Sequence, residues 1–192
     1  MIRASIILED LLAREPPKQL TLDWLTKSLD KHSFGLIVLL FALLAAAPGI
    51  SILGALLLLI PGIQMIVGLS APSFPRWIAV RPLPAKQIAP VMQRAVSVLR
   101  IVETVIHPRW PTPPQATKRI VGIVVMILTI RILLAPLPLS NVIPAVLIAL
   151  ISLAYLEEDG LTLFVSIAAG LLLGVIELGF AATIIQAGHH YL

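Results

Sequence analysis

The chain has 192 residues, of which 58% are hydrophobic and 12% charged, with a net charge of +4 and a mean hydropathy of +1.00. A single soluble core of this size cannot bury so much apolar surface, so the composition excludes an ordinary soluble domain and predicts an integral membrane protein. The absence of cysteine excludes disulfides, thiolate catalysis and Cys-based metal sites.

Residues 1–33 are expected to form an amphipathic N-terminal segment in two short parts, separated by Pro16 and Pro17. In the second part Leu22, Leu25 and Leu29 share one helical face, opposite a charged face. Such a helix lies on a membrane surface. A cytosolic helix packed against the membrane core fits the pattern equally well.

The first apolar block, residues 34–71, is interrupted at Pro48-Gly49 and again at Pro61-Gly62. Its uninterrupted parts are shorter than the about 20 residues that a membrane-spanning helix needs. These parts are 34–47, 50–60 and 63–71. We therefore predict a broken or re-entrant membrane hairpin, unless Pro61 only kinks a helix that continues through it.

The middle of the chain, residues 72–119, carries eight Lys or Arg residues and one acid, Glu103. By the positive-inside rule this basic loop should face the cytoplasm. It contains an expected amphipathic helix over 90–106, which would lie in the membrane interface. Anionic lipids are the expected partners. Nucleic acid is not expected, because the loop lies between two membrane blocks and has few aromatic residues.

The second apolar block, residues 120–156, is interrupted by "PLPLSNVIP" at 136–144 and predicts a second broken hairpin. Residues 157–192 should form an acidic turn, a C-terminal transmembrane helix and a tail. Within them, 161–186 is the one uninterrupted apolar segment long enough to cross a bilayer. The acids of the turn are expected to be solvated.

The two blocks align as an internal repeat, with Gly35 opposite Gly122 and Pro48 opposite Pro136. Matched interruptions in two halves are typical of transporter binding sites, because unwound backbone cannot face lipid and must face protein or a polar cavity. Kinks that only allow helices to pack are the alternative. The alignment leaves open whether the repeats are parallel or inverted.

Charged side chains within apolar segments are costly and therefore suggest a functional site. Arg131 and Glu177 are the two examples, and they would also suit a structural ion pair. Polar residues near the interruptions complete the candidate substrate-binding set. They are Ser51, Gln64, Ser140 and Asn141. Half-helices starting near Ser51 and Asn141 would attract a small anionic solute or a lipid head group. Local capping of a half-helix by Ser140 or Asn141 is the alternative and fits the sequence at least as well.

Three motifs carry a family resemblance: "PSFPR" at 72–76, "PLPLSNVIP" at 136–144 and "EEDG" at 157–160. With their layout along residues 34–180, the chain resembles the ExoD family of bacterial membrane proteins linked to exopolysaccharide synthesis. The resemblance implies a multi-pass protein of the bacterial inner membrane that is associated with exopolysaccharide production. It implies no known reaction.

The sequence thus predicts an all-α membrane protein of two repeated hairpins, with a transporter-like or lipid-translocating function. A non-transporting scaffold of the exopolysaccharide machinery is the alternative. No enzyme, cofactor or metal is expected, because no nucleophile–base set is visible and His189 and His190 lack further ligands. Gly170 and Gly174 favour a close helix contact, either within the monomer or in a homodimer.

Overall fold

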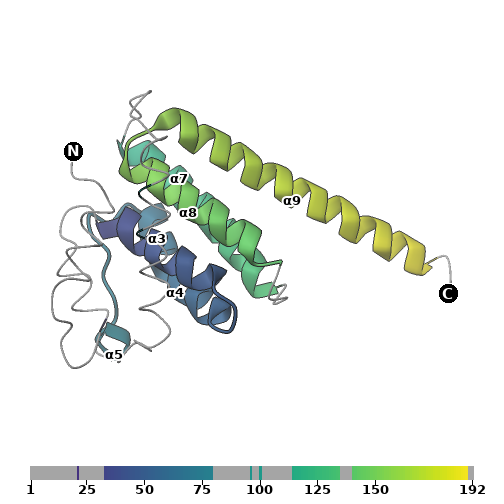
Figure 1. The fold of residues 1–192 in the computed structure, drawn as a ribbon, viewed down its shortest axis with the longest axis horizontal. Helices are drawn as coiled ribbons and strands as arrows, with labels where there is room; N and C mark the ends of the chain where they lie inside the picture. The colour runs from purple at the N-terminus through teal and green to yellow at the C-terminus, as the bar shows by residue number, and fades with distance from the viewer. Residues whose placement is uncertain are drawn as a thin grey trace.

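The computed structural model describes residues 33–79, 114–134 and 140–189, together with Thr21, Val96 and Arg100. The elements of these residues are helices, as predicted for an all-α chain (Figure 1). They are α3 (Ser33–Ala46), α4 (Ser51–Val67), α5 (Arg76–Ala79), α7 (Pro114–Leu134), α8 (Val142–Leu156) and α9 (Gly160–His189).

Helices α3 and α4 form the first hairpin, and the predicted interruption at Pro48-Gly49 is its turn. Gly49 has a φ of 90°, a left-handed conformation that glycine adopts without steric cost. The second predicted interruption, at Pro61-Gly62, is absent: α4 continues through both residues, in agreement with the alternative that the helix continues through Pro61. Proline removes one intrahelical hydrogen bond without ending the helix, and packing against α7 covers this region. A Cβ on Gly62 would lie 2.9 Å from Met126 Sδ.

Helices α7 and α8 form the second hairpin, and both are longer than the arms expected from the sequence. Helix α7 has 21 residues because it begins at Pro114, in the basic loop, and proline suits the first turn of a helix. Helix α8 begins at Val142, so that Pro144 also lies in a first turn. The turn between them includes Ser140 and Asn141.

The two hairpins pack side by side as a four-helix bundle, in which α3 contacts α4 and α8, and α7 contacts α4 and α8. Both turns lie at one end of the bundle, since the side chains of Ser51 and Asn141 are hydrogen-bonded. We call this the turn end. At the opposite, open end, the Lys118 ammonium lies 4.2 Å from the centre of the Phe34 ring.

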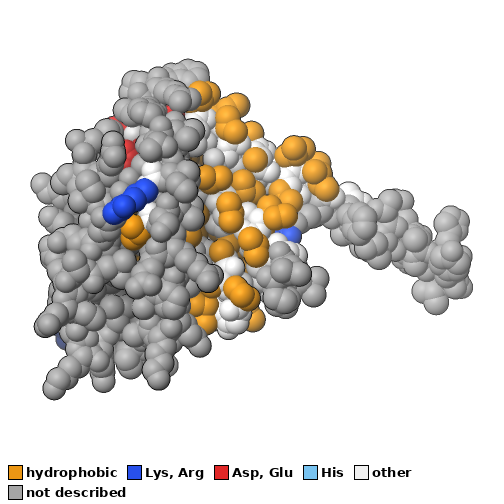
Figure 2. All heavy atoms as spheres, viewed as in Figure 1, with side chains coloured by type: hydrophobic (Ala, Val, Ile, Leu, Met, Phe, Trp, Pro, Cys, Tyr) orange, Lys and Arg blue, Asp and Glu red, His pale blue; other side chains and the backbone are white. Residues whose placement is uncertain are grey.

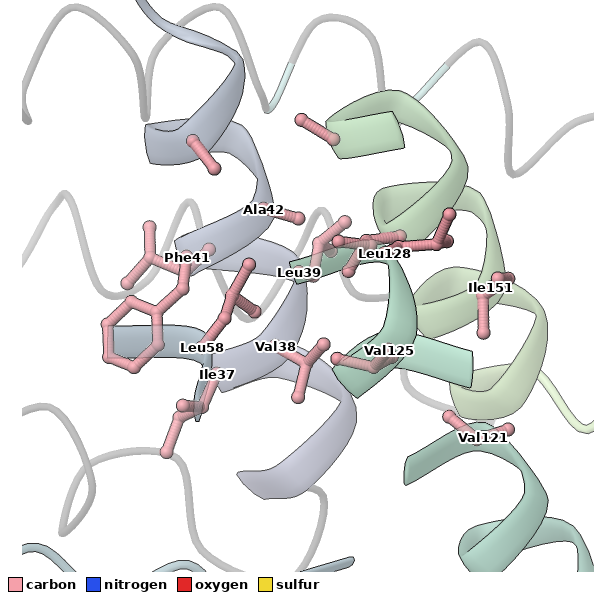
Figure 3. Close-up of a cluster of buried hydrophobic side chains, with 14 of the residues drawn as sticks. Ile37, Val38, Leu39, Phe41, Ala42, Leu58, Val121, Val125, Leu128 and Ile151 are labelled. Atoms are coloured by element: carbon pink, nitrogen blue, oxygen red, sulfur yellow. The ribbon is translucent and has the colours of Figure 1, made fainter. Parts of the chain in front are cut away.

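Helix α3 is the centre of the core, because nearly all of its side chains from Phe34 to Ala45 are buried. A helix that is apolar on every side must be surrounded by other elements. Helices α4, α7 and α8 surround α3. The segment after α4 adds Phe74, whose ring packs edge to face against Phe41 with 6.0 Å between the ring centres. Figure 3 shows the core residues from α3 (Ile37, Val38, Leu39, Phe41, Ala42), α4 (Leu58), α7 (Val121, Val125, Leu128) and α8 (Ile151).

Helix α9 follows α8 after a short acidic turn and, with 30 residues, is twice as long as α8. It packs on α8, touches α7 and extends beyond the bundle (Figure 1). The helix predicted over 161–186 is therefore present within α9. Its membrane span is not confirmed: among the helices of the described residues, none combines the length and the apolarity that crossing a bilayer requires.

The outward faces of four helices carry large exposed hydrophobic side chains, many of them visible in Figure 2. The most exposed are Leu134 of α7, at 80%, and Phe164 of α9, at 70%. Other members are Ile52, Leu56 and Ile63 of α4, Ile123, Ile127 and Ile130 of α7, Ile143 and Val146 of α8, and Leu172, Val175 and Ile176 of α9. We call this set the apolar outer surface.

Two predicted elements fall outside the described residues. One is the N-terminal segment 1–33, apart from Thr21 and Ser33. The other is the helix over 90–106, within which Val96 and Arg100 alone are described, both with helical backbone.

Candidate functional site

A direct hydrogen bond joins the two helix turns. Asn141 Nδ2 donates to Ser51 Oγ at 3.1 Å, and both side chains are buried. Ser51 is the first residue of α4 and Asn141 immediately precedes α8, so the bond connects the starts of the second helices of the two hairpins. The two sequence interruptions predicted to be functionally related therefore meet in space.

Arg131 lies beside this junction, in the last turn of α7. Its Nη1 donates to the backbone oxygen of Ser140 at 2.7 Å, and the side chain is partly buried. A short bond from a guanidinium to a carbonyl is one of the stronger kinds of hydrogen bond. Four of the six predicted site residues thus lie together, and we call Ser51, Arg131, Ser140 and Asn141 the turn-end cluster.

Asn141 has one side-chain oxygen without a protein partner. Its side chain is 2% exposed, and Oδ1 makes no hydrogen bond. A buried acceptor in this state costs free energy, of the order of 1–3 kcal/mol, that a bound donor would recover. The cluster can therefore accept a hydrogen bond as well as donate several.

Thr129 shows the same feature and was not predicted as a site residue. It is fully buried in α7, two residues before Arg131, and its hydroxyl has no partner. A threonine in an apolar run is common in helix cores, so the sequence alone carries no signal that would distinguish it. The unpartnered hydroxyl emerges only from the packing.

The starts of α4 and α8 lack side-chain caps. Ile50 and Asn141 occupy the positions before these helices, and neither side chain bonds to the backbone of its helix. Asn141 therefore does not cap α8, and its amide is bonded to Ser51 across the bundle instead. Capping by Ser140 stays a prediction. The first N–H groups of a helix carry a partial positive charge and favour an anion.

Gln64 does not belong to the turn-end cluster. Because α4 is continuous through Pro61, Gln64 lies thirteen residues after Ser51, about 20 Å along the helix. Its amide pairs with the backbone of Ser73: Nε2 donates to the carbonyl oxygen, and Oε1 accepts from the N–H at 2.9 Å. Gln64 thus fastens the segment that follows α4 to the open end.

Glu177 lies in α9, seventeen residues after its start. Its side chain is outside the described part of the molecule, so the pairing with Arg131 suggested by the sequence stays a prediction. Helix α9 does run along the bundle from the open end toward the turn end (Figure 1).

The acidic turn between α8 and α9 is structural, and its acids are less solvated than expected. Asp159 is fully buried: Oδ1 accepts from the N–H groups of Leu161 and Thr162 at 3.1 and 3.3 Å, and Oδ2 accepts from Thr162 Oγ1 at 2.7 Å. Glu157 is also buried, whereas Glu158 is exposed with a φ of 54°. Asp159 therefore caps α9. Within the described residues no three metal-ligating side chains gather in one place.

A family model described as "Exopolysaccharide synthesis, ExoD" matches residues 4–179, which is most of the chain and includes the whole turn-end cluster. No curated protein and no solved structure matches the sequence.

Proposed function

The chain belongs to the ExoD family, which is linked to exopolysaccharide synthesis, and from this premise we propose that it is a membrane protein that binds and moves an anionic solute or lipid head group. The observation that carries the proposal is the meeting of the two interrupted hairpins at the turn-end cluster, where Asn141 bonds to Ser51 and Arg131 bonds to Ser140. Such a polar junction inside an otherwise apolar bundle is the kind of place where transport proteins bind their cargo.

The apolar outer surface supports a location in the bacterial inner membrane. Soluble monomers rarely expose apolar patches larger than a few hundred Å², and here such side chains cover the outward faces of four helices. We propose that lipid covers these faces and that the hairpins enter the bilayer from the open end. The basic residues Lys118 and Arg119 at that end agree with a cytoplasmic position for the 72–119 loop.

The contacts between the hairpins support parallel repeats. If the hairpins exchanged places, α7 would take the position of α3 and α4 the position of α8. The α3–α8 contact would then become the α7–α4 contact, and both contacts are present. Gly35 and Gly122, aligned in sequence, lie at these two contacts. A Cβ on Gly35 would be 3.4 Å from the Ser152 oxygen, and one on Gly122 would be 3.1 Å from the Gly62 oxygen.

This arrangement suggests how cargo would reach the cluster. Parallel hairpins place both turns on one side of the bundle, so rocking between inverted halves is not the expected motion. Instead, loss of the Asn141–Ser51 bond would let the two turns separate and expose the polar groups between them. The buried junction is the closed state in this scheme.

Lipid movement in reconstituted vesicles tests the proposal. Phosphatidylcholine vesicles with fluorescent phosphatidylglycerol would be treated with dithionite, which bleaches only the outer leaflet. Protein should make inner-leaflet lipid accessible, and Arg131→Ala should slow this by about tenfold or more, as expected for loss of a charge-assisted contact. The sequence-derived Glu177→Gln variant should also slow it.

Arg119→Ala is the matched control, because Arg119 is an exposed arginine of the same helix at the open end. It should transport at the wild-type rate. Equal rates for the wild type, Arg131→Ala and Glu177→Gln, with all three folded, would defeat the proposal.

A non-transporting scaffold is the second candidate. One observation favours it: Val96 packs partly against the core while Arg100, one turn later, lies at the surface. Copurification of exopolysaccharide synthesis proteins with the wild type, lost when Arg94 and Arg100 are changed to Glu, would support this role. Unchanged copurification would reject it.

A further inference from the structure

We propose that the turn-end cluster selects an amphiphile whose head group carries both a phosphate and hydroxyl groups, as in a lipid-linked sugar phosphate. This inference rests on the proposed function, because it names the class of ligand that the same site would take. Three features of the cluster support it: an unsatisfied acceptor, a cationic side chain beside an uncapped helix, and an apolar rim.

The unsatisfied acceptor calls for a hydroxyl or another donor. Asn141 Oδ1 and Thr129 Oγ1 are the two buried side-chain oxygens without a partner in the described part of the chain, and both lie in the half of the bundle nearer the turns. A phosphate diester has no hydrogen to donate and cannot satisfy Asn141 Oδ1. Sugar hydroxyls both donate and accept, and they suit Asn141.

The cationic part of the cluster calls for an anion. Arg131 holds its guanidinium at the backbone of Ser140, immediately before the first turn of α8. Asn141 does not cap this turn and Pro144 has no N–H group, so the helix start offers the N–H groups of Val142 and Ile143. Guanidinium groups and helix N-termini are the two common ways in which proteins bind phosphate.

The rim of the cluster calls for an acyl chain. Large exposed apolar side chains flank the polar residues on both sequence sides: Ile130 and Leu134 beside Arg131, and Ile143 beside Asn141. Leu134 is 80% exposed, the highest value among these side chains. Bilayer lipid covers this rim in the proposed membrane location. The acyl chain of a lipid-linked ligand would replace that lipid along the rim, which a soluble sugar phosphate cannot do.

Four probes separate these contributions. Glucosyl dodecyl phosphate carries phosphate, hydroxyls and chain, and methyl dodecyl phosphate, also a phosphate diester, lacks the sugar. Dodecyl glucoside lacks the phosphate, and glucose 1-phosphate lacks the chain. Their affinities would be measured with the full-length protein in phosphatidylcholine nanodiscs. The wild type should bind glucosyl dodecyl phosphate at least about tenfold more tightly than any of the other three.

Two variants identify the residues responsible. Asn141→Ala should lower the affinity for glucosyl dodecyl phosphate to that of methyl dodecyl phosphate and leave the binding of methyl dodecyl phosphate unchanged. Arg131→Gln should lower the affinity for glucosyl dodecyl phosphate to the affinity for dodecyl glucoside. Arg119→Gln, at the other end of α7, should change nothing. If Asn141→Ala does not fold, Ser51→Ala can replace it, because this change removes the hydrogen-bond partner of Asn141. It should selectively weaken the binding of glucosyl dodecyl phosphate.

The outcomes separate this inference from the proposed function. Equal binding of the four probes, or losses in Arg131→Gln no larger than in Arg119→Gln, would overturn the ligand class even if vesicle transport stands. Strong binding of glucose 1-phosphate would show that the ligand is a free solute and would overturn the lipid-linked form. Selective binding without any vesicle transport would support the ligand class and reject transport.

Discussion

At the scale of single residues, the chain contains two buried polar side chains with opposite hydrogen-bonding states. Asp159 uses both carboxylate oxygens within its own turn, whereas Asn141 leaves Oδ1 without a partner. A satisfied buried group stabilises the fold, and an unsatisfied one is tolerated where it has another use. Asp159 therefore contributes to stability, and Asn141 is the residue that we propose for ligand binding.

The first prediction concerns Asp159. Asp159→Ala removes the cap of α9 and should lower the free energy of unfolding by about 1–2 kcal/mol. Glu158→Ala is the control, since Glu158 is the exposed neighbour in the same turn, and it should have little effect. Thermal unfolding followed by circular dichroism measures both. A similar loss in the two variants would mean that the turn acts through its charge rather than through the cap.

Most of the candidate site was predictable at this scale. Ser51, Arg131, Ser140 and Asn141 are polar residues in or beside apolar segments, and the cost of burying them marks them in the sequence. Gln64 met the same criterion but lies at the open end, because its position depends on whether α4 stops at Pro61. Thr129 did not meet this criterion, because a threonine in an apolar helix is common. Its hydroxyl lacks a partner only because of how the neighbouring helices pack around it.

At the scale of helices, two Pro-Gly pairs of the first hairpin have opposite effects. Pro48-Gly49 ends α3 and turns the chain, and Pro61-Gly62 lies buried within a continuous helix. The local sequences resemble each other, but the second pair packs against α7. Glycine here permits a close approach between helices, as Gly54 also does between α4 and α3.

The second prediction concerns this close approach. A Cβ on Gly54 would lie 2.4 Å from the Ala45 nitrogen, and backbone atoms cannot move aside as a flexible side chain can. Gly54→Ala should therefore force α3 and α4 apart and lower the free energy of unfolding by at least about 1–3 kcal/mol.

Gly174→Ala provides the comparison, because no atom lies within 4 Å of a Cβ at Gly174 in α9. Alanine has the higher helix propensity, so this variant should be neutral or up to about 1 kcal/mol more stable. Denaturant unfolding of both variants gives the two values. Equal stability of Gly54→Ala and the wild type would contradict the tight α3–α4 contact.

At the scale of the whole molecule, the two hairpins stand side by side with their turns at one end. A protein without cysteine allows this arrangement to be tested cleanly, since any introduced pair is the only pair present. Ser51→Cys combined with Asn141→Cys should crosslink rapidly with a short bifunctional thiol reagent. Gln64→Cys combined with Asn141→Cys should not, because these residues lie at opposite ends. Mass spectrometry of the digested protein identifies the linked peptides. Similar yields for both pairs would contradict the arrangement.

The sequence by itself determined the helical class, the family, the position of the turn in each hairpin and four members of the polar cluster. These features depend on local composition and on the cost of polar groups in apolar segments, which are properties of the chain alone. Only the tertiary structure decided that α4 continues through Pro61, that Gln64 is remote from the cluster, and that both turns share one end. It also decided which buried oxygens lack partners. Each of these depends on contacts between helices far apart in sequence, and local patterns do not encode such contacts.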